Sequence, residues 1–131
     1  MTQPIGEEPS IFTRILRGEV PGDVVLQTED VFVLRDIAPQ APVHLLVIPK
    51  TGEYADVSAL AAADPKLLAH MVDVAKVAAT QAGATDFRLI FNTGAGAGQT
   101  VFHVHAHVLA SPAEPLGERT MAGGLPAEGP A

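Results

Sequence analysis

The sequence predicts an α+β domain: a five-stranded antiparallel sheet, connected as a meander and covered by helix. Short segments rich in Val, Ile and Leu are joined by tight turns, and one long helical pattern separates the third of them from the fourth. The chain has 131 residues, which suffices for one domain with its own core but is short for two. We therefore expect a single sheet, a short N-terminal helix, and a long helix between the third and fourth strands.

The N-terminal half contains the short helix and three strands. Ser10 is a suitable N-cap for a helix over Ile11–Arg17, because its hydroxyl can accept from an amide of the first turn. The segments Val24–Gln27 and Val31–Arg35 are separated by a polar turn and are predicted to form a hairpin. The third strand, Val43–Ile48, lies between two prolines that mark its ends.

The long helix is predicted to begin at Asp64-Pro65 and to end at Gly83. Its apolar residues recur at helical spacing on one stripe, which consists of Leu67, Met71, Val74 and Ala78. Phe87–Asn92 follows as the fourth strand and Val101–Leu109 as the fifth.

The predicted domain spans residues 11–112, after an N-terminal extension of residues 1–10. Residues 113–131 are expected to form a partly mobile tail, because their Gly, Pro and Ala content gives them no core. The chain contains no apolar stretch long enough for a membrane span, and its polar, acidic opening lacks the features of a secretion signal. With no cysteine in the sequence, we expect a cytoplasmic protein without membrane association.

The charge balance bears on the kind of ligand. The chain carries 15 acidic against 8 basic residues, a formal net charge of -7. Nucleic-acid polymers need a basic surface that neutralises many phosphates, so we expect no such partner. A small phosphate ligand remains compatible with this charge, because local amides and imidazoles can bind it.

Three histidines at every second position are the strongest functional signal. His103, His105 and His107 lie in the predicted fifth strand, where a period of two would place all three rings on one face, about 7 Å apart at Cα. Buried rings each need hydrogen-bond partners, so packing alone is a poor explanation. A metal site and phosphorus chemistry both stay open at this point. The second is favoured because it also uses the glycine-rich segment 92–100, whose amides can face an anion.

The segment Gly98–Val108 closely resembles the signature of the histidine-triad (HIT) family, in particular its Hint branch. Ile11-Phe12, the segment from Gly18 to Pro21, the segment from Asp36 to His44, and the segment from Val47 to Lys50 resemble the N-terminal half of Hint proteins, in the same order. The resemblance implies a homodimer whose sheets join across the interface. It also implies a mechanism that needs no metal and no cofactor.

The resemblance implies a role for each of four histidines. His105 would attack the α-phosphorus of a nucleotide and form a nucleotidyl-histidine intermediate. His103 would support it, and His107 would contact phosphate and assist the departure of the leaving group. His44 matches the fourth family histidine, although a satisfied core histidine is an equal alternative from the residue alone.

The other predicted site residues hold the nucleotide. Gln99 and Thr100 are expected to donate to phosphate oxygens, with Thr100 counted among the catalytic residues, while Asn92 and the Gly98 amide complete the cradle. Asp36 is expected to accept from both ribose hydroxyls. The purine would lie among apolar residues that match the family's base pocket, namely Ile11, Phe12, Leu34 and Ile37.

The expected function is therefore a hydrolase or nucleotidyl transferase. Its substrate would be a purine nucleotide, an AMP or GMP derivative with a phosphoramidate or acyl-adenylate type bond at the α-phosphate. Two alternatives remain: a dinucleoside polyphosphate hydrolase of the Fhit branch, and a nucleotide-binding interaction module with incidental turnover. The sequence after Ala110 does not resemble Hint proteins, so it does not identify the leaving group.

Overall fold

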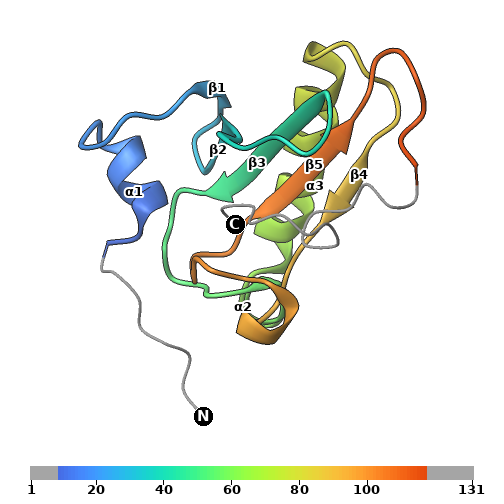
Figure 1. Ribbon diagram of the computed structural model, residues 1–131. Helices are drawn as coiled ribbons and strands as arrows, with labels where there is room; N and C mark the ends of the chain where they lie inside the picture. The colour runs from blue at the N-terminus through green and yellow to red at the C-terminus, as the bar shows by residue number, and fades with distance from the viewer. Residues whose placement is uncertain (1–8, 118–131) are drawn as a thin grey trace.

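A computed structural model describes residues 9–117 of the chain. Most of the expected extension and tail, residues 1–8 and 118–131, therefore lies outside the described part. The elements, in chain order, are α1 (Ile11–Leu16), β1 (Val24–Gln27), β2 (Val31–Arg35), β3 (Val43–Pro49), α2 (Val57–Ala63), α3 (Pro65–Gln81), β4 (Arg88–Ile90), the 3₁₀ turn η1 (Ala95–Ala97) and β5 (Ala106–Ala110) (Figure 1). None of the described helices is long and apolar enough to cross a lipid bilayer.

The five strands form one antiparallel sheet, which confirms the predicted fold class. Their order is β1-β2-β3-β5-β4. β1 to β3 follow each other as a meander, but β5 then lies between β3 and β4, so the sheet as a whole is not a simple meander. The pairing of Leu46 with His107 and of His44 with Leu109 places the last strand directly beside the third.

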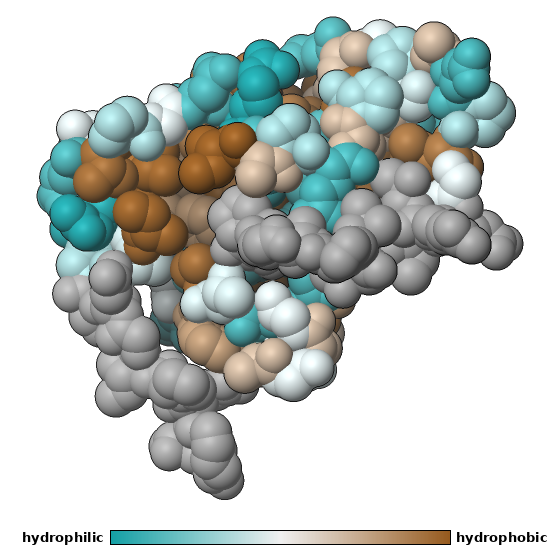
Figure 2. Space-filling model, viewed as in Figure 1, coloured by the Kyte–Doolittle hydropathy of each residue, from teal (hydrophilic) through white to brown (hydrophobic). Residues whose placement is uncertain are grey.

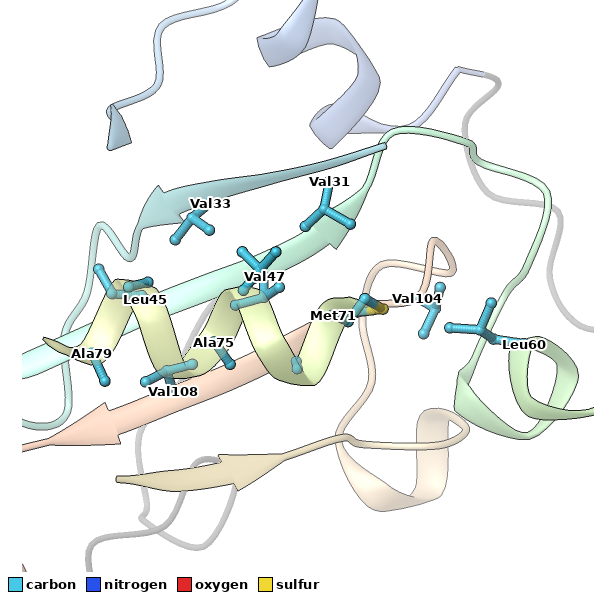
Figure 3. Close-up of a cluster of buried hydrophobic side chains, with 13 residues drawn as sticks. Val31, Val33, Leu45, Val47, Leu60, Met71, Ala75, Ala79, Val104 and Val108 are labelled. Carbon is cyan, nitrogen blue, oxygen red and sulfur yellow. The ribbon is translucent and has the colours of Figure 1, made fainter. Parts of the chain in front are cut away.

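Helix α3 covers one face of the sheet and makes the main core. Met71 and Val74 from the predicted stripe are buried, and three alanines of α3, Ala75, Ala78 and Ala79, let the helix approach the strands closely. Figure 3 shows Met71, Ala75 and Ala79 of α3 on the side of the sheet that carries Val33, Val47 and Val108. The helical period predicted from the sequence is thus confirmed by burial.

The opposite face of the sheet carries the second core cluster and two histidines, His44 and His107. Because side chains alternate along a strand, the neighbours of the α3-facing residues point the other way. Leu34, Leu46 and Ile48 pack there against Phe12 of α1. By the same alternation His44 and His107 lie on this face. Among the described residues, the short helix α1 packs on this face through Phe12.

Several elements differ from the sequence prediction: the fourth strand is shorter, at Arg88–Ile90, and η1 was not predicted. Helix α2 was not predicted; it is capped by Asp56, whose Oδ1 accepts from Ala59 N at 2.9 Å. The fifth strand begins at Ala106 instead of Val101, because the β3 ladder with it ends at the Val47 to Ala106 pair. Just before the strand, the chain bends and Val104 N donates to Tyr54 O at 2.9 Å instead of to a strand.

Candidate active site

The three triad histidines are buried side by side, although only His107 lies in a strand. His103 and His105 precede β5 in bent backbone, so the prediction that all three project from one strand was wrong. The row of rings forms nonetheless. The ring centres of His105 and His107 are 5.5 Å apart, and the Phe12 ring meets His105 edge-on at 4.9 Å and His103 at 5.7 Å.

The backbone fixes which nitrogen of His105 carries the proton. Nδ1 lies 2.8 Å from the carbonyl oxygen of His103. A carbonyl oxygen can only accept, so Nδ1 donates, and the neutral ring has its lone pair on Nε2. A neutral imidazole with the lone pair on Nε2 has the form required of a nucleophile.

His44 and His107 form a second ordered pair. The amide of Gln40 donates to His44 Nδ1 at 3.1 Å, so a neutral His44 carries its proton on Nε2. That nitrogen lies 2.9 Å from His107 Nδ1 and donates to it. A neutral His107 therefore carries its own proton on Nε2, where it is a hydrogen-bond donor.

Burial keeps His44 neutral. Desolvation lowers the pKa of His44 below its ordinary value, and the neighbouring His107 lowers it further, while the Asp36 carboxylate opposes both effects. The pKa of His44 is lowered overall, which agrees with the hydrogen-bond pattern of a neutral ring.

Asp36 lies beneath this pair and is fully buried at its side chain. Its Oδ1 accepts from Ala38 N at 2.8 Å, and its Oδ2 is 3.4 Å from His44 Nε2 and has no hydrogen-bond partner. Asp36 thus has spare acceptor capacity, as a ribose contact requires. Asp36 also lines the apolar pocket at α1 that is described below, and its ribose assignment stays a prediction.

The side chain of Gln99 binds backbone groups, and the phosphate contact expected of it stays a prediction. It is only 2 % exposed, and its Nε2 donates to Ala55 O at 2.7 Å and to Val101 O at 2.9 Å. Its Oε1 accepts from Gly94 N at 2.8 Å. Both amide protons are committed to the backbone, so in this structure Gln99 braces the loop and does not point a donor at phosphate.

The glycine-rich loop also uses its own amides. Gly98 N donates to Ala95 O at 3.0 Å at the end of the 3₁₀ turn, and the expected contact of the Gly98 amide to phosphate stays a prediction. Gly94 and Gly98 have φ of 91° and 100°, a backbone region that favours glycine. Thr100, at the end of this loop, is exposed, and Asn92, at its start, is half-buried. Both precede the triad in the sequence.

An apolar pocket of about 230 Å³ lies between α1 and β2. The four residues predicted to enclose a purine, Ile11, Phe12, Leu34 and Ile37, all line it. Ile37 is 87 % exposed and so belongs to the rim of the pocket and not to the core. In Figure 2 hydrophobic surface gathers over α1 and its surroundings. A larger hollow of about 560 Å³ lies beside β4 and the end of α3, and no histidine lines it.

One group of side chains has the composition of a metal site. Ligand atoms of Asp36, His44 and His107 all lie within 4.8 Å of one another. This is not the set that the sequence suggested, since His103 and His105 are absent from it. Here a proton already joins the two imidazoles at 2.9 Å, and a metal ion would have to replace it.

The fold and the ordered histidines define a histidine-triad domain. The HIT domain family model matches residues 17–113, and the chain belongs to the HIT family. It is 41% identical over 112 residues to the purine nucleoside phosphoramidase of Escherichia coli strain K12, covering 84% of this chain and 92% of that protein. It is 39% identical over 109 residues to the 14 kDa zinc-binding protein of Zea mays, covering 80% of this chain and 84% of that protein.

Solved structures agree with this assignment. The HIT family hydrolase from Clostridium thermocellum superposes with a TM-score of 0.77 at 34% identity, covering 86% of this chain and 99% of that chain. The comparisons therefore support a hydrolase. Sequence reasoning found the four histidines of the site but missed Ser10, whose Oγ lies 2.6 Å from His103 Nδ1. The only signal in the sequence was its suitability as a helix cap.

Proposed function

We propose that the protein is a purine nucleotide hydrolase or nucleotidyl transferase that cleaves a phosphoramidate or acyl-adenylate type bond at the α-phosphate. The observation that carries this proposal is the tautomer of His105. Its Nδ1 donates to a backbone carbonyl at 2.8 Å, which leaves the lone pair on Nε2, in a ring whose centre lies 5.5 Å from that of His107. The phosphoramidase relative supports the substrate class.

The first half-reaction transfers the nucleotidyl group to His105. Its Nε2 forms a bond to the α-phosphorus while the bond from that phosphorus to the leaving atom breaks, and the electron pair departs with that atom. His107 Nε2–H donates a hydrogen bond to the leaving atom and keeps its proton: a leaving nitrogen that enters protonated departs as a neutral amine, and a leaving carboxylate departs as the anion. The Nδ1–H of His105 keeps its carbonyl partner throughout.

The second half-reaction returns the protein to its starting state. Water attacks the phosphorus and releases one proton to the solvent, and the bond to His105 breaks with its electron pair returning to the ring. The product is a nucleoside monophosphate. Thr100 and Asn92 are proposed to hold the phosphate oxygens, and the apolar pocket at α1 is proposed to hold the base.

We further propose a homodimer working in the cytoplasm. Strand β4 is an edge of the sheet in the described part of the chain, and an open edge offers backbone groups to a second copy. Light scattering coupled to size exclusion tests this. A monomeric mass across micromolar concentrations would contradict it.

The test of the activity compares turnover of adenosine phosphoramidate, an aminoacyl-adenylate mimic and diadenosine polyphosphates, each with and without a chelator. We expect the first two to be the better substrates and chelation to have no effect. Faster turnover of the polyphosphates would favour a Fhit-type hydrolase. Loss of activity on chelation, restored by zinc, would favour a metal site. AMP binding without turnover of any substrate would favour an interaction module.

The covalent intermediate is tested on His105 directly. A substrate labelled at the α-phosphate, quenched within a single turnover, is expected to leave an acid-labile label on His105. His105→Ala should bind AMP, carry no label and lose turnover. A variant that retains wild-type kcat would contradict the covalent mechanism. His70→Ala, which replaces a histidine of helix α3 outside the triad, serves as the matched control.

A further inference from the structure

Ser10 joins the N-terminal helix to the histidine triad. It is the N-cap of α1, where its Oγ accepts from Thr13 N at 3.2 Å. The same Oγ lies 2.6 Å from Nδ1 of His103, which is 93 residues further along the chain. One hydroxyl therefore makes both a helix cap and a contact to the site.

The direction of this hydrogen bond follows from the other side of the ring. His103 Nε2 lies 2.7 Å from the carbonyl oxygen of Pro49, which can only accept, so Nε2 carries a proton. A neutral His103 then has its lone pair on Nδ1, and the hydroxyl of Ser10 donates to it. The Ser10 oxygen still accepts from Thr13 N at 3.2 Å, and the longer 3.4 Å contact between the Ser10 and Thr13 hydroxyls takes its proton from Thr13.

The position of His103 affects His105, the proposed nucleophile, through the backbone. The His103 carbonyl oxygen accepts from His105 Nδ1 at 2.8 Å and so sets the His105 tautomer. Phe12, two residues after Ser10, packs edge-on against both rings. Phe12 also lines the apolar pocket at α1. Ser10 therefore joins α1, the helix that bounds this pocket, to the triad histidines by a hydrogen bond.

We propose that Ser10 is a positioning residue for the reaction of His105, acting by donating to His103 Nδ1 and holding that ring in its Nε2–H tautomer. This inference rests on the proposed function for its kinetic consequence, but the hydrogen bond itself can be measured without any activity. Ser10 touches no reacting atom in this scheme. Its effect passes through His103 and its carbonyl to His105.

Three substitutions separate the donor from the cap. Ser10→Ala removes both. Ser10→Asp keeps a good N-cap for α1, but an ionised carboxylate cannot donate to His103. Ser10→Thr keeps both the cap and the hydroxyl. Asp64→Ala is the matched control, since it removes the cap of α3, where Oδ1 accepts from Leu67 N at 3.1 Å.

The kinetic result expected is a fall in kcat of about tenfold for Ser10→Ala and Ser10→Asp, the scale of one lost hydrogen bond in a site. Ser10→Thr should restore kcat to near the wild-type value, and Asp64→Ala should leave it unchanged at a temperature where all variants are folded. A role limited to holding α1 would instead raise KM through the apolar pocket, leave kcat unchanged, and be rescued by Ser10→Asp. That pattern would overturn the proposal.

Nitrogen-15 spectra of the histidine rings provide the second measurement. Wild-type protein is expected to show His103 with its proton on Nε2, and Ser10→Ala is expected to show a shifted Nδ1 signal and a mixture of tautomers. An unchanged His103 spectrum in Ser10→Ala would overturn the proposal even if no substrate is turned over. Absence of turnover in wild-type protein with the expected spectra would instead overturn the proposed function alone.

Discussion

Replacing Gln99 by Met should destabilise the fold, because the structure uses this side chain to hold the loop before the triad. The substitution nearly preserves volume while removing both the amide donors and the acceptor. It leaves three backbone partners without their bonds, namely Gly94 N, Ala55 O and Val101 O. Gln99 is 2 % exposed, so water replaces these partners poorly.

The magnitude follows from the number of bonds. A buried hydrogen bond contributes about 1 kcal/mol net, so three should contribute about 3 kcal/mol to the free energy of unfolding. Urea unfolding followed by circular dichroism measures this loss. Gln81→Met, at the exposed end of α3, is the matched control and should change stability by less than about 0.5 kcal/mol.

Activity distinguishes this role from the one that the sequence suggested. If Gln99 only braces the loop, Gln99→Met should lose kcat and stability together. A low concentration of urea should then lower the kcat and the stability of the variant further. If instead stability stays within about 0.5 kcal/mol of wild type while kcat falls a hundredfold or more, the amide serves the substrate, and the loop-bracing argument is refuted.

Three other perturbations test the remaining parts of the site. Thr100→Ala should slow kcat by about 10-fold to 1000-fold, the effect of one lost transition-state donor, and Thr100→Ser should keep most of the rate; an unchanged rate for Thr100→Ala in steady-state assays would mean that the hydroxyl only shapes the turn. Calorimetry with AMP and dAMP tests Asp36, whose unsatisfied Oδ2 should make the deoxy ligand weaker by about 1 to 3 kcal/mol; equal affinities would remove Asp36 from the ribose site. Because burial lowers the pKa of His44 below 6.5, the unfolded chain binds more protons than the folded one between the two pKa values. The contribution of His44 to stability is therefore complete above pH 6.5 and is lost as pH falls through that window. In melting curves between pH 7.5 and 5, His44→Gln should lose less stability than wild type, and an equal loss would contradict the lowered pKa.

Local patterns in the sequence determined the elements and their faces. The apolar stripe of α3 predicted that Met71 and Val74 are buried, because apolar residues that recur every 3.6 residues mark the side of a helix that packs on the core. The run of apolar residues between two prolines likewise predicted a strand over Val43–Ile48, and the structure has β3 at Val43–Pro49. These patterns depend only on neighbours within a few residues, so the sequence alone contains them.

Only the tertiary structure decided which groups meet and which proton each ring carries. Ser10 reaches His103 across 93 residues, and Gln99 reaches Ala55 across 44. No period links such positions, because their distance depends on how the sheet, the helices and the loops pack together. The same packing places β5 between β3 and β4, and so brings His107 to His44. The sequence thus identified the imidazoles, while the carbonyls, amides and hydroxyl that fix their tautomers come from the folded chain.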